Sequence, residues 1–364
     1  GSRYLHLSIL QHFFSHCGRK VPFDLSSRRS KVQPCGIQVK NTCRKAEFQG
    51  LFDRYWVLDW SARSRPSPAH PSSDAIWIAD ANRTGRQVKT LYFRTRHQAF
   101  LHLQQNLTAI TQSKARQRVF LGVDFSLGAP AGWSDLLGLD GPSAPWQRWW
   151  QEVRQVIEDH PDQSNNRFQA AAHWNAIVSG GHTPGPFWGR PQRVDLPNLP
   201  AHSPTFPFLL SQGRSVARKR TVETRLPGTQ ELWKLMGVGS VGSQSLLGLA
   251  MCHRLRFESP FRDAIGIWPM ETGFLTSPSS DWPQIVLAEV WPGIARQQVS
   301  QWQDEHPESI IDQAQVAALA QHLRDLDRHQ QLVRWLAPPP DLTGQQMEQV
   351  LQEEGWIAGA HACI

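Results

Sequence analysis

The stretch Arg54-Tyr-Trp-Val-Leu-Asp59 joins four apolar side chains to a carboxylate. Two later runs have the same design, Val119-Phe-Leu-Gly-Val-Asp124 and Ile285-Val-Leu-Ala-Glu289. Short apolar runs bounded by turn residues are typical of buried strands. A carboxylate at a buried strand end is costly to desolvate unless a cation or hydrogen-bond donors meet it. We therefore expect three neighbouring strands that gather Asp59, Asp124 and Glu289 in one site.

Three carboxylates on neighbouring strands predict a divalent metal site. Hard oxygen ligands suit Mg²⁺ or Mn²⁺, and such ions activate water for phosphodiester cleavage. A fourth acid from a helix often completes such a site, and Asp312 and Asp327 on a predicted long helix are candidates. Glu271 follows a short strand and is a further candidate ligand or base. For each acid taken singly, the alternative is a cap or a salt bridge.

The net charge of +7 comes from the first part of the chain. Residues 1–50 contain nine Lys or Arg and two acids, a surplus that equals the whole excess, and the rest of the chain is neutral. A basic balance favours nucleic-acid partners, but here this signal belongs to residues 1–50. We interpret them as a basic leader that is disordered or not native, with a nucleic-acid arm as the alternative.

The cysteines and the apolar segments indicate the compartment. The five cysteines form no CxxC pair and have irregular spacing, which supports neither a zinc site nor a disulfide framework. No apolar stretch reaches the roughly 18 residues of a membrane span. We therefore predict a cytoplasmic protein that does not bind membranes. The sequence does not indicate protein partners.

The periodicity of residues 51–364 predicts an α/β domain with a mixed sheet. Residues 75–80 and 90–94 predict a hairpin, and residues 95–112 predict a helix that leads into strand 119–124. The first three strands then form an antiparallel meander. Further helices are predicted over 143–160 (with Trp146, Trp149 and Trp150 on a core face), 165–178 (N-cap Ser164), 230–236, 243–252, 313–335 (N-cap Asp312) and 344–354 (without a capping box), and strands over 264–268 and 285–291.

Two polar segments are candidates for substrate binding. Gly237-Val-Gly-Ser-Val-Gly242 matches GxGxxG, but no predicted strand precedes it, so a glycine turn that opens a helix and binds an anion is favoured over dinucleotide binding. The dense basic run 218–225 includes Arg220 and Arg225 and predicts either a phosphate clamp or a solvated loop. Asn165 and Arg167 stand at a helix start and are either caps or ligands.

Seven stretches of the sequence carry a resemblance to known proteins: 54–61, 122–130, 165–168, 186–189, 239–244, 268–273 and 288–292. Together they resemble a bacterial family of unknown function that is assigned a ribonuclease H-like fold. The resemblance covers residues 53–358 and implies that fold and a nuclease-like metal site, but no established reaction. Residues 135–284 would be a large helical, Gly/Pro-rich insertion into that core. We also predict substrate contacts from Asn165, Arg167, Ser240, Ser243 and Gln244.

These observations predict a metal-dependent phosphodiester hydrolase that acts on nucleic acid or a nucleotide. Asp59, Asp124 and Glu289 would bind Mg²⁺ or Mn²⁺, with Asp327 or Glu271 assisting. Two alternatives stay open. One is a non-catalytic module that binds a nucleotide or small anion at the glycine turn. The other is a cofactor-biosynthesis enzyme, since some relatives in the resembling family carry molybdopterin or cobalamin labels.

Overall fold

The computed structural model describes residues 50–181, 185–210, 213–279 and 281–363. The predicted leader, apart from Gly50, lies outside this range. Among the described residues, no helix is both long and apolar enough to cross a membrane.

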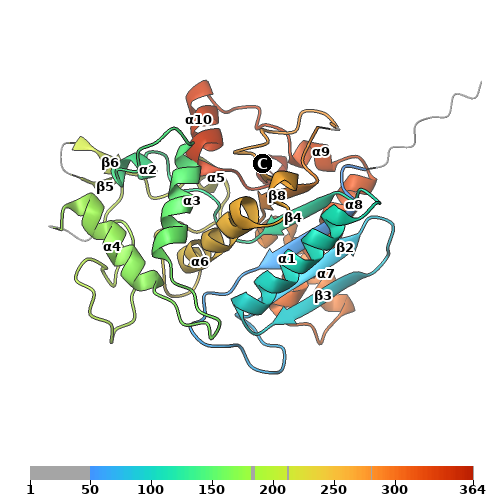
Figure 1. The fold of residues 1–364 in the computed structure, drawn as a ribbon, viewed down its shortest axis with the longest axis horizontal. Helices are drawn as coiled ribbons and strands as arrows, with labels where there is room; N and C mark the ends of the chain where they lie inside the picture. The colour runs from blue at the N-terminus through green and yellow to red at the C-terminus, as the bar shows by residue number, and fades with distance from the viewer. Residues whose placement is uncertain (1–49, 182–184, 211–212, 280, 364) are drawn as a thin grey trace, which may run out of the picture. The chain divides into compact units, whose positions relative to one another are not determined.

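A mixed sheet of six strands forms the centre of the fold (Figure 1). Its strand order is β3-β2-β1-β4-β8-β7. The β1–β2 and β2–β3 pairs are antiparallel, whereas β4, β8 and β7 continue parallel to β1. The predicted meander is thus confirmed. The strands are β1 Arg54–Asp59, β2 Ile76–Asn82, β3 Val88–Phe93, β4 Val119–Val123, β7 Ile265–Trp268 and β8 Ile285–Glu289.

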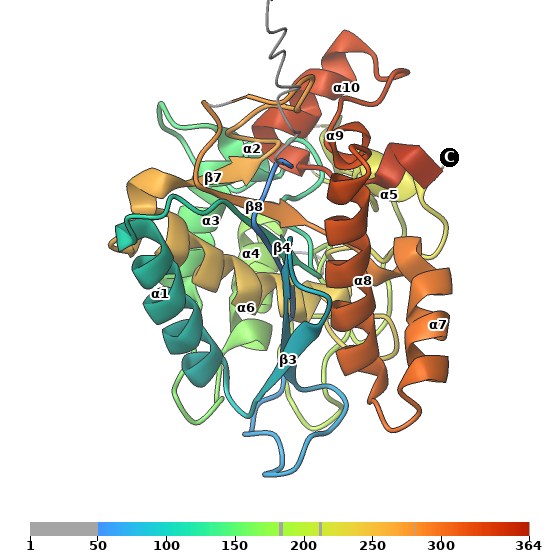
Figure 2. The same cartoon turned by 90° about the vertical axis from the view of Figure 1, so that its right-hand side faces the viewer.

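Helices cover both faces of the sheet (Figure 2). Helices α1 and α6 cover one face, α8 covers the other, and α7 packs on α8. The helices are α1 Arg96–Gln112, α2 Trp133–Leu136, α3 Pro145–Val156, α4 Arg167–Ser179, α5 Thr221–Arg225, α6 Val241–His253, α7 Arg296–Glu305, α8 Ile311–Arg328, α9 Leu332–Trp335 and α10 Gly344–Gln349.

Alternation along the strands decides which side chains face which helix. Leu58 and Val123 belong to the cluster on the α1 side, whereas Val57 and Ala288 belong to the cluster on the α8 side. Both faces are apolar because both are covered, so the strands read as continuous hydrophobic runs. A shift of one residue at a strand end therefore changes the face of a side chain.

The segment between β4 and β8 carries helices α2 to α6, the short β5 Phe208–Leu209 and β6 Ser215–Val216 pair, and β7 at the sheet edge. Its core is aromatic: the Trp133 ring contacts those of Trp149, Phe187 and Trp233 at centroid distances of 4.9–5.8 Å. Edge-to-face contacts of this kind add to the hydrophobic stabilisation. Trp149 is fully buried, as predicted, and so are Trp146 and Trp150.

Several predicted helix boundaries are wrong. Residues 230–236 form no helix, because Leu235 N–H donates to Trp188 O (2.9 Å) in an extended pairing. The predicted helix 313–335 is two helices, α8 and α9, and Asp312 lies in the first turn of α8 with Ile310 at the N-cap.

Caps account for the other differences at helix ends. The N-cap of α4 is Asn166 rather than Ser164. Helix α10 begins with a capping box, because Gln346 is the third helical residue after Thr343 and returns the hydrogen bond.

Asp327, a predicted catalytic acid, anchors the start of β1. Its carboxylate accepts the Leu51 N–H (2.8 Å) and the Phe52 N–H (3.1 Å), and the Tyr55 hydroxyl donates to it. The side chain is fully buried. Burial and the Asp327 carboxylate both raise the pKa of Tyr55. The structure thus gives Asp327 a capping role at the end of β1 opposite Asp59.

The substitution Asp327→Asn should lower the free energy of unfolding by about 2 kcal/mol, because the amide supplies fewer acceptors to three buried donors. Urea unfolding at neutral pH measures the loss. Asp304→Asn, at an exposed position of α7, is the control and should cost about 0.5 kcal/mol or less. Equal losses in the two variants would contradict the anchoring role.

Candidate active site

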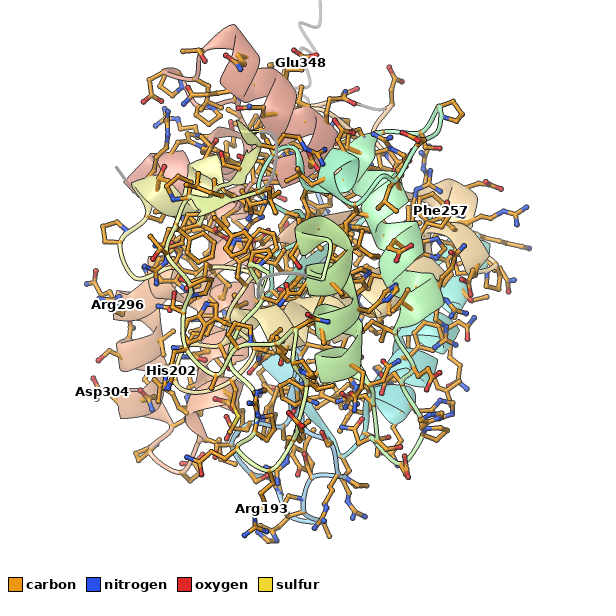
Figure 3. All side chains as sticks on the ribbon, turned by 90° about the vertical axis from the view of Figure 1, so that its left-hand side faces the viewer. Arg193, His202, Phe257, Arg296, Asp304 and Glu348 are labelled. Atoms are coloured by element: carbon orange, nitrogen blue, oxygen red, sulfur yellow. The ribbon has the colours of Figure 1, made fainter. Side chains whose placement is uncertain are left out.

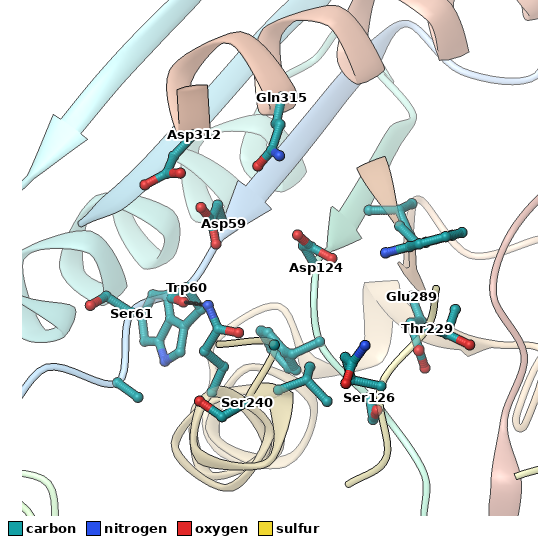
Figure 4. A pocket seen from close by; sticks show the side chains of 18 of the residues that line it. Asp59, Trp60, Ser61, Asp124, Ser126, Thr229, Ser240, Glu289, Asp312 and Gln315 are labelled. Atoms are coloured by element: carbon teal, nitrogen blue, oxygen red, sulfur yellow. Dashed lines mark hydrogen bonds between the residues drawn. The ribbon is translucent and has the colours of Figure 1, made fainter. Parts of the chain in front are cut away.

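A cavity of about 630 Å³ lies at the carboxyl ends of β1, β4 and β8 (Figure 4). Ligand sites of open α/β sheets form at this edge. The loop after β1, the glycine turn before α6 and the first turn of α8 enclose it. Its polar lining includes Asp59, Arg63, Asp74, Asp124, Ser126, Arg220, Glu223, Ser240, Gln244, Glu289, Asp312 and Gln315.

Asp59 and Asp124 are neighbours because β1 and β4 run parallel in register. Leu58 pairs with Val123, and Asp124 N–H donates to Leu58 O (3.0 Å). Since Leu58 and Val123 face α1, the next residue on each strand faces α8. Figure 4 shows the two carboxylates beside each other at the cavity wall. The predicted convergence of these two acids is confirmed.

Asp312 joins the pair from the first turn of α8, next to Asp59 (Figure 4). Its Oδ2 atom accepts the Asp74 N–H (2.7 Å), which holds the carboxylate at the cavity. Of the two helix acids that the sequence offered, the structure brings Asp312 to the site and places Asp327 elsewhere.

The three carboxylates repel one another. Asp59 is only 8% exposed, and burial, followed by the charges of Asp124, Asp312 and Asp74, raises its pKa well above the usual range. Burial, followed by the charges of Glu289 and Asp312, raises the pKa of Asp124 to about 7. Within the described part of the chain, no Lys or Arg forms an ion pair with Asp59 or Asp124. This acidic pair is therefore uncompensated by any cationic side chain of the described residues, and a hydrogen bond from the Trp60 backbone lowers the pKa of Asp59 only in part.

Glu289, the third predicted metal ligand, forms an ion pair with a buried arginine. Arg220 binds both of its oxygens (2.8 and 2.6 Å), and Leu127 N–H donates to Oε2 (3.0 Å). Glu289 pairs with Val123 rather than Asp124, so its side chain leaves the opposite face of the sheet from Ala288. Glu289 therefore lines the same cavity as Asp59 and Asp124, as predicted, but its carboxylate is engaged by Arg220. Its role as a metal ligand stays a prediction.

Arg220 joins several segments of the chain by hydrogen bonds and is not free to bind a phosphate. It is fully buried, and its five N–H groups have acceptors. Besides Glu289, these are Glu223 Oε1 (2.8 Å), Ser126 Oγ (3.1 Å) and Glu354 O (2.8 Å). The predicted phosphate clamp at this position is therefore corrected: Arg220 lines the cavity but leaves no N–H for a substrate.

Other predicted site residues lie away from the cavity. Glu271 binds Arg256 (2.8 Å) and accepts the Ile267 N–H (3.1 Å) at the end of β7. Arg225 binds Asp341 (2.6 Å). Neither Glu271 nor Arg225 lines the cavity. Each already has an ionic partner that accounts for its position.

Asn165, Arg167 and Ser243 form a chain that fastens α4 to α6. Arg167 donates to Ser243 Oγ (2.9 Å) and to Asn165 Oδ1 (2.7 Å), and Ser243 donates to Leu235 O (2.6 Å). Burial, followed by the charge of Arg96, lowers the pKa of Arg167 to about 10. These three residues do not line the cavity. Their contacts are structural.

The glycine turn is a wall of the cavity, together with the predicted Ser240 and Gln244. Gly237 and Gly239 have φ values of 95° and 72°, which only glycine adopts without strain. Val238 between them is 97% exposed. The turn opens α6, as predicted, and Gln244 Nε2 donates to Trp60 O (2.6 Å).

The sequence reasoning missed several polar residues of the cavity, among them Asp74 and Arg63. Asp74 has a φ of 52° and presents its N–H to Asp312. Its local signal was weak, because an aspartate before a strand is common in turns. Arg63 lies in the Pro-rich loop after β1, where the sequence shows no period.

The described residues provide only part of the coordination shell of a metal ion. Across these ranges, no three His, Cys, Asp or Glu side chains group at the spacing of one metal ion. Asp59 and Asp124 provide two carboxylates, and the Asp312 carboxylate is engaged with Asp74. No family model, curated protein or solved structure matches the chain. The resemblance noted in the sequence stays a prediction.

The substitution Glu289→Gln should lower the free energy of unfolding by about 3 kcal/mol, because it leaves the Arg220 charge partly unpaired in a buried place. Urea unfolding measures this loss. Glu308→Gln, at an exposed position, is the matched control. A loss no larger than the control's would mean that Glu289 does not neutralise Arg220.

Asp124→Asn should change how stability depends on pH. In the wild type, the folded pKa of about 7 exceeds the ordinary value of 3.8, so the folded state binds the proton more tightly and stability falls as the pH rises through this window. Asparagine does not titrate. The difference in free energy of unfolding between the variant and the wild type should therefore rise by roughly 2 kcal/mol, in favour of the variant, between about pH 5 and about pH 8. A chelator keeps the protein free of metal in this measurement.

Unfolding curves at the two pH values, with Asp304→Asn on the exposed side of α7 as the control, measure this gain. If the free energy of unfolding depends on pH in the same way in the wild type and in Asp124→Asn, the pKa of Asp124 is not raised in the folded protein.

Proposed function

We propose that this protein is a metal-dependent phosphodiester hydrolase that acts on nucleic acid or a nucleotide. The observation that carries the proposal is the uncompensated pair of Asp59 and Asp124, buried side by side at the wall of a large cavity. Perturbed, converging carboxylates in a cavity are typical of functional sites. A divalent cation would relieve their repulsion.

We also propose that the sheet is a ribonuclease H-like core. The order β3-β2-β1-β4-β8, with an antiparallel meander followed by parallel strands, supports this assignment. The positions of the acids also support it, because Asp59 ends β1, Asp124 follows β4 and Asp312 lies on the later helix α8. Strand β7 and helices α2 to α6 would then be elaborations between β4 and β8.

The donor set fits Mg²⁺ or Mn²⁺. Mg²⁺ is usually bound by one or two carboxylates, and waters and substrate phosphates complete its shell. Asp59 and Asp124 are such a pair, and the cavity has room for the remaining ligands. When bound, the cation would lower the pKa of a water and offset the charge that develops on the phosphate.

The protein's own groups have separate roles in the proposed hydrolysis. The water oxygen bonds to phosphorus while the bond from phosphorus to the leaving alcohol oxygen breaks, and that oxygen takes a proton from solvent. We assign the proton lost by the water to Asp312 Oδ1, since Oδ2 already accepts the Asp74 N–H. Burial, as its largest cause, raises the pKa of Asp312, which suits a proton acceptor. Ser240 and Gln244 would orient the phosphate oxygens.

A non-catalytic anion-binding module is the second candidate, because the glycine turn and the start of α6 form a wall of the cavity. The charge of the cavity argues against an anion bound without a cation. The charged lining consists of the acids Asp59, Asp74, Asp124, Glu223, Glu289 and Asp312 and the bases Arg63 and Arg220.

Mn²⁺ affinity at about pH 8 tests the proposal. Asp59→Asn and Asp124→Asn should each weaken Mn²⁺ binding at least about tenfold, because each removes a ligand charge. Both should also lower cleavage by roughly a hundredfold or more. Titration calorimetry and a panel of single-stranded, duplex and branched DNA, RNA and nucleotides provide the measurements. Asp263→Asn, at an exposed position, is the control.

Unchanged Mn²⁺ affinity in both variants would refute the hydrolase. Nucleotide binding that needs no divalent cation and leads to no turnover would favour the anion-binding module instead.

A further inference from the structure

A second cavity of about 400 Å³ adjoins the first on the side of α7 and α8. The two cavities share Asp124, Trp291 and Gln315. Asp124 therefore stands at the junction of two spaces rather than at the end of one. A substrate whose reacting bond lies at Asp124 would have a group in each cavity.

The Trp291 ring is a fixed aromatic wall of the second cavity. The ring folds back over Gly293, where an added β-carbon would lie 2.3 Å from a ring atom. Any side chain at position 293 would displace the ring, so the glycine maintains its position. Trp291 is half-buried, which leaves part of the indole accessible. A rigid, partly exposed indole can stack on a flat ring.

Arg296 provides a cation next to this ring. A β-carbon on Gly228 would lie 3.3 Å from the Trp291 ring and 3.8 Å from an Arg296 nitrogen, so the two side chains meet over Gly228. Arg296 is exposed at the start of α7 (Figure 3), and among the described residues its guanidinium has no ion-pair partner. An unpaired guanidinium next to an aromatic face suits a phosphate and a base from one nucleotide.

The charges of the two cavities differ. The charged lining of the second is limited to Asp124 and Arg296, whereas acids dominate the first. A second phosphate of a polynucleotide would meet less repulsion on the α7 side. Gln303 and Gln315 also line this side and offer amide groups to a base.

We infer that the second cavity is a nucleotide subsite, with the base on Trp291 and a phosphate on Arg296. The substrate would be a single-stranded polynucleotide that crosses Asp124 from one cavity to the other. This inference rests on the proposed function for the reaction, but the subsite can be measured by binding. Trp291 and Arg296, the two side chains assigned to the subsite, belong neither to the acidic pair nor to the contacts of Arg220.

Calorimetry with thymidylate and with inorganic phosphate, in Mg²⁺, tests the subsite. Trp291→Ala should weaken thymidylate binding about tenfold and leave phosphate binding within about twofold, because base stacking is lost. Trp291→Phe should retain most of the thymidylate affinity. This result would show that the weaker binding by Trp291→Ala comes from the lost aromatic ring and not from misfolding. Arg296→Ala should weaken both ligands about tenfold. Arg193→Ala is the matched control, at an exposed position separate from Arg296 (Figure 3).

Thymidylate affinity that is unchanged in both Trp291→Ala and Arg296→Ala, or no thymidylate binding by the wild type, would overturn the subsite. If polynucleotide cleavage is then still observed, the proposed hydrolase function holds and only the proposed subsite is wrong. If thymidylate binding depends on both side chains but cleavage is absent, the subsite stands and the hydrolase fails.

Discussion

Electrostatic repulsion between Asp59 and Asp124 is the constraint around which the site is organised. The parallel register of β1 and β4 brings the two strand ends together, and burial withholds the water that would screen them. Burial is the largest cause of the raised pKa of both acids; the charge of Asp124 adds to it at Asp59, and the charges of Glu289 and Asp312 add to it at Asp124. Keeping both acids charged therefore costs stability. Unrelieved strain of this kind is concentrated at functional sites, where a ligand removes it. The enclosing cavity and the third acid, Asp312, fit that interpretation.

Glu289 lies at the same edge of the sheet but has the cationic partner that Asp59 and Asp124 lack. Its carboxylate is matched by Arg220, which also ties α5 to the chain after β4 and to the backbone near the C-terminal end. Buried ion pairs contribute little net stability, but removing one partner is expensive. The pair therefore acts as a rigid frame: it fixes the ends of β4 and β8, and so the position of Asp124.

Sequence patterns predicted most of the sheet and the convergence of Asp59, Asp124 and Glu289 at one cavity, but not which partner each acid would have. Asp59 and Asp124 were predictable because the ends of parallel strands meet at one edge. The pairing of Glu289 with Arg220 was not predicted, because a register offset of one residue sends the Glu289 side chain to the other face of the sheet. Asp312 and Asp327 were equivalent on sequence grounds, although a helix separates them by about 22 Å. No local signal distinguishes a buried arginine in a basic run from exposed ones.

The position of a bound cation tests the central claim most directly. A crystal grown with Mn²⁺ at about pH 8 reports that position through anomalous scattering. The account predicts a peak between the carboxylates of Asp59 and Asp124, with the Arg220–Glu289 pair intact. A peak on Glu289 with Arg220 displaced, or no peak at the acidic pair, would contradict it.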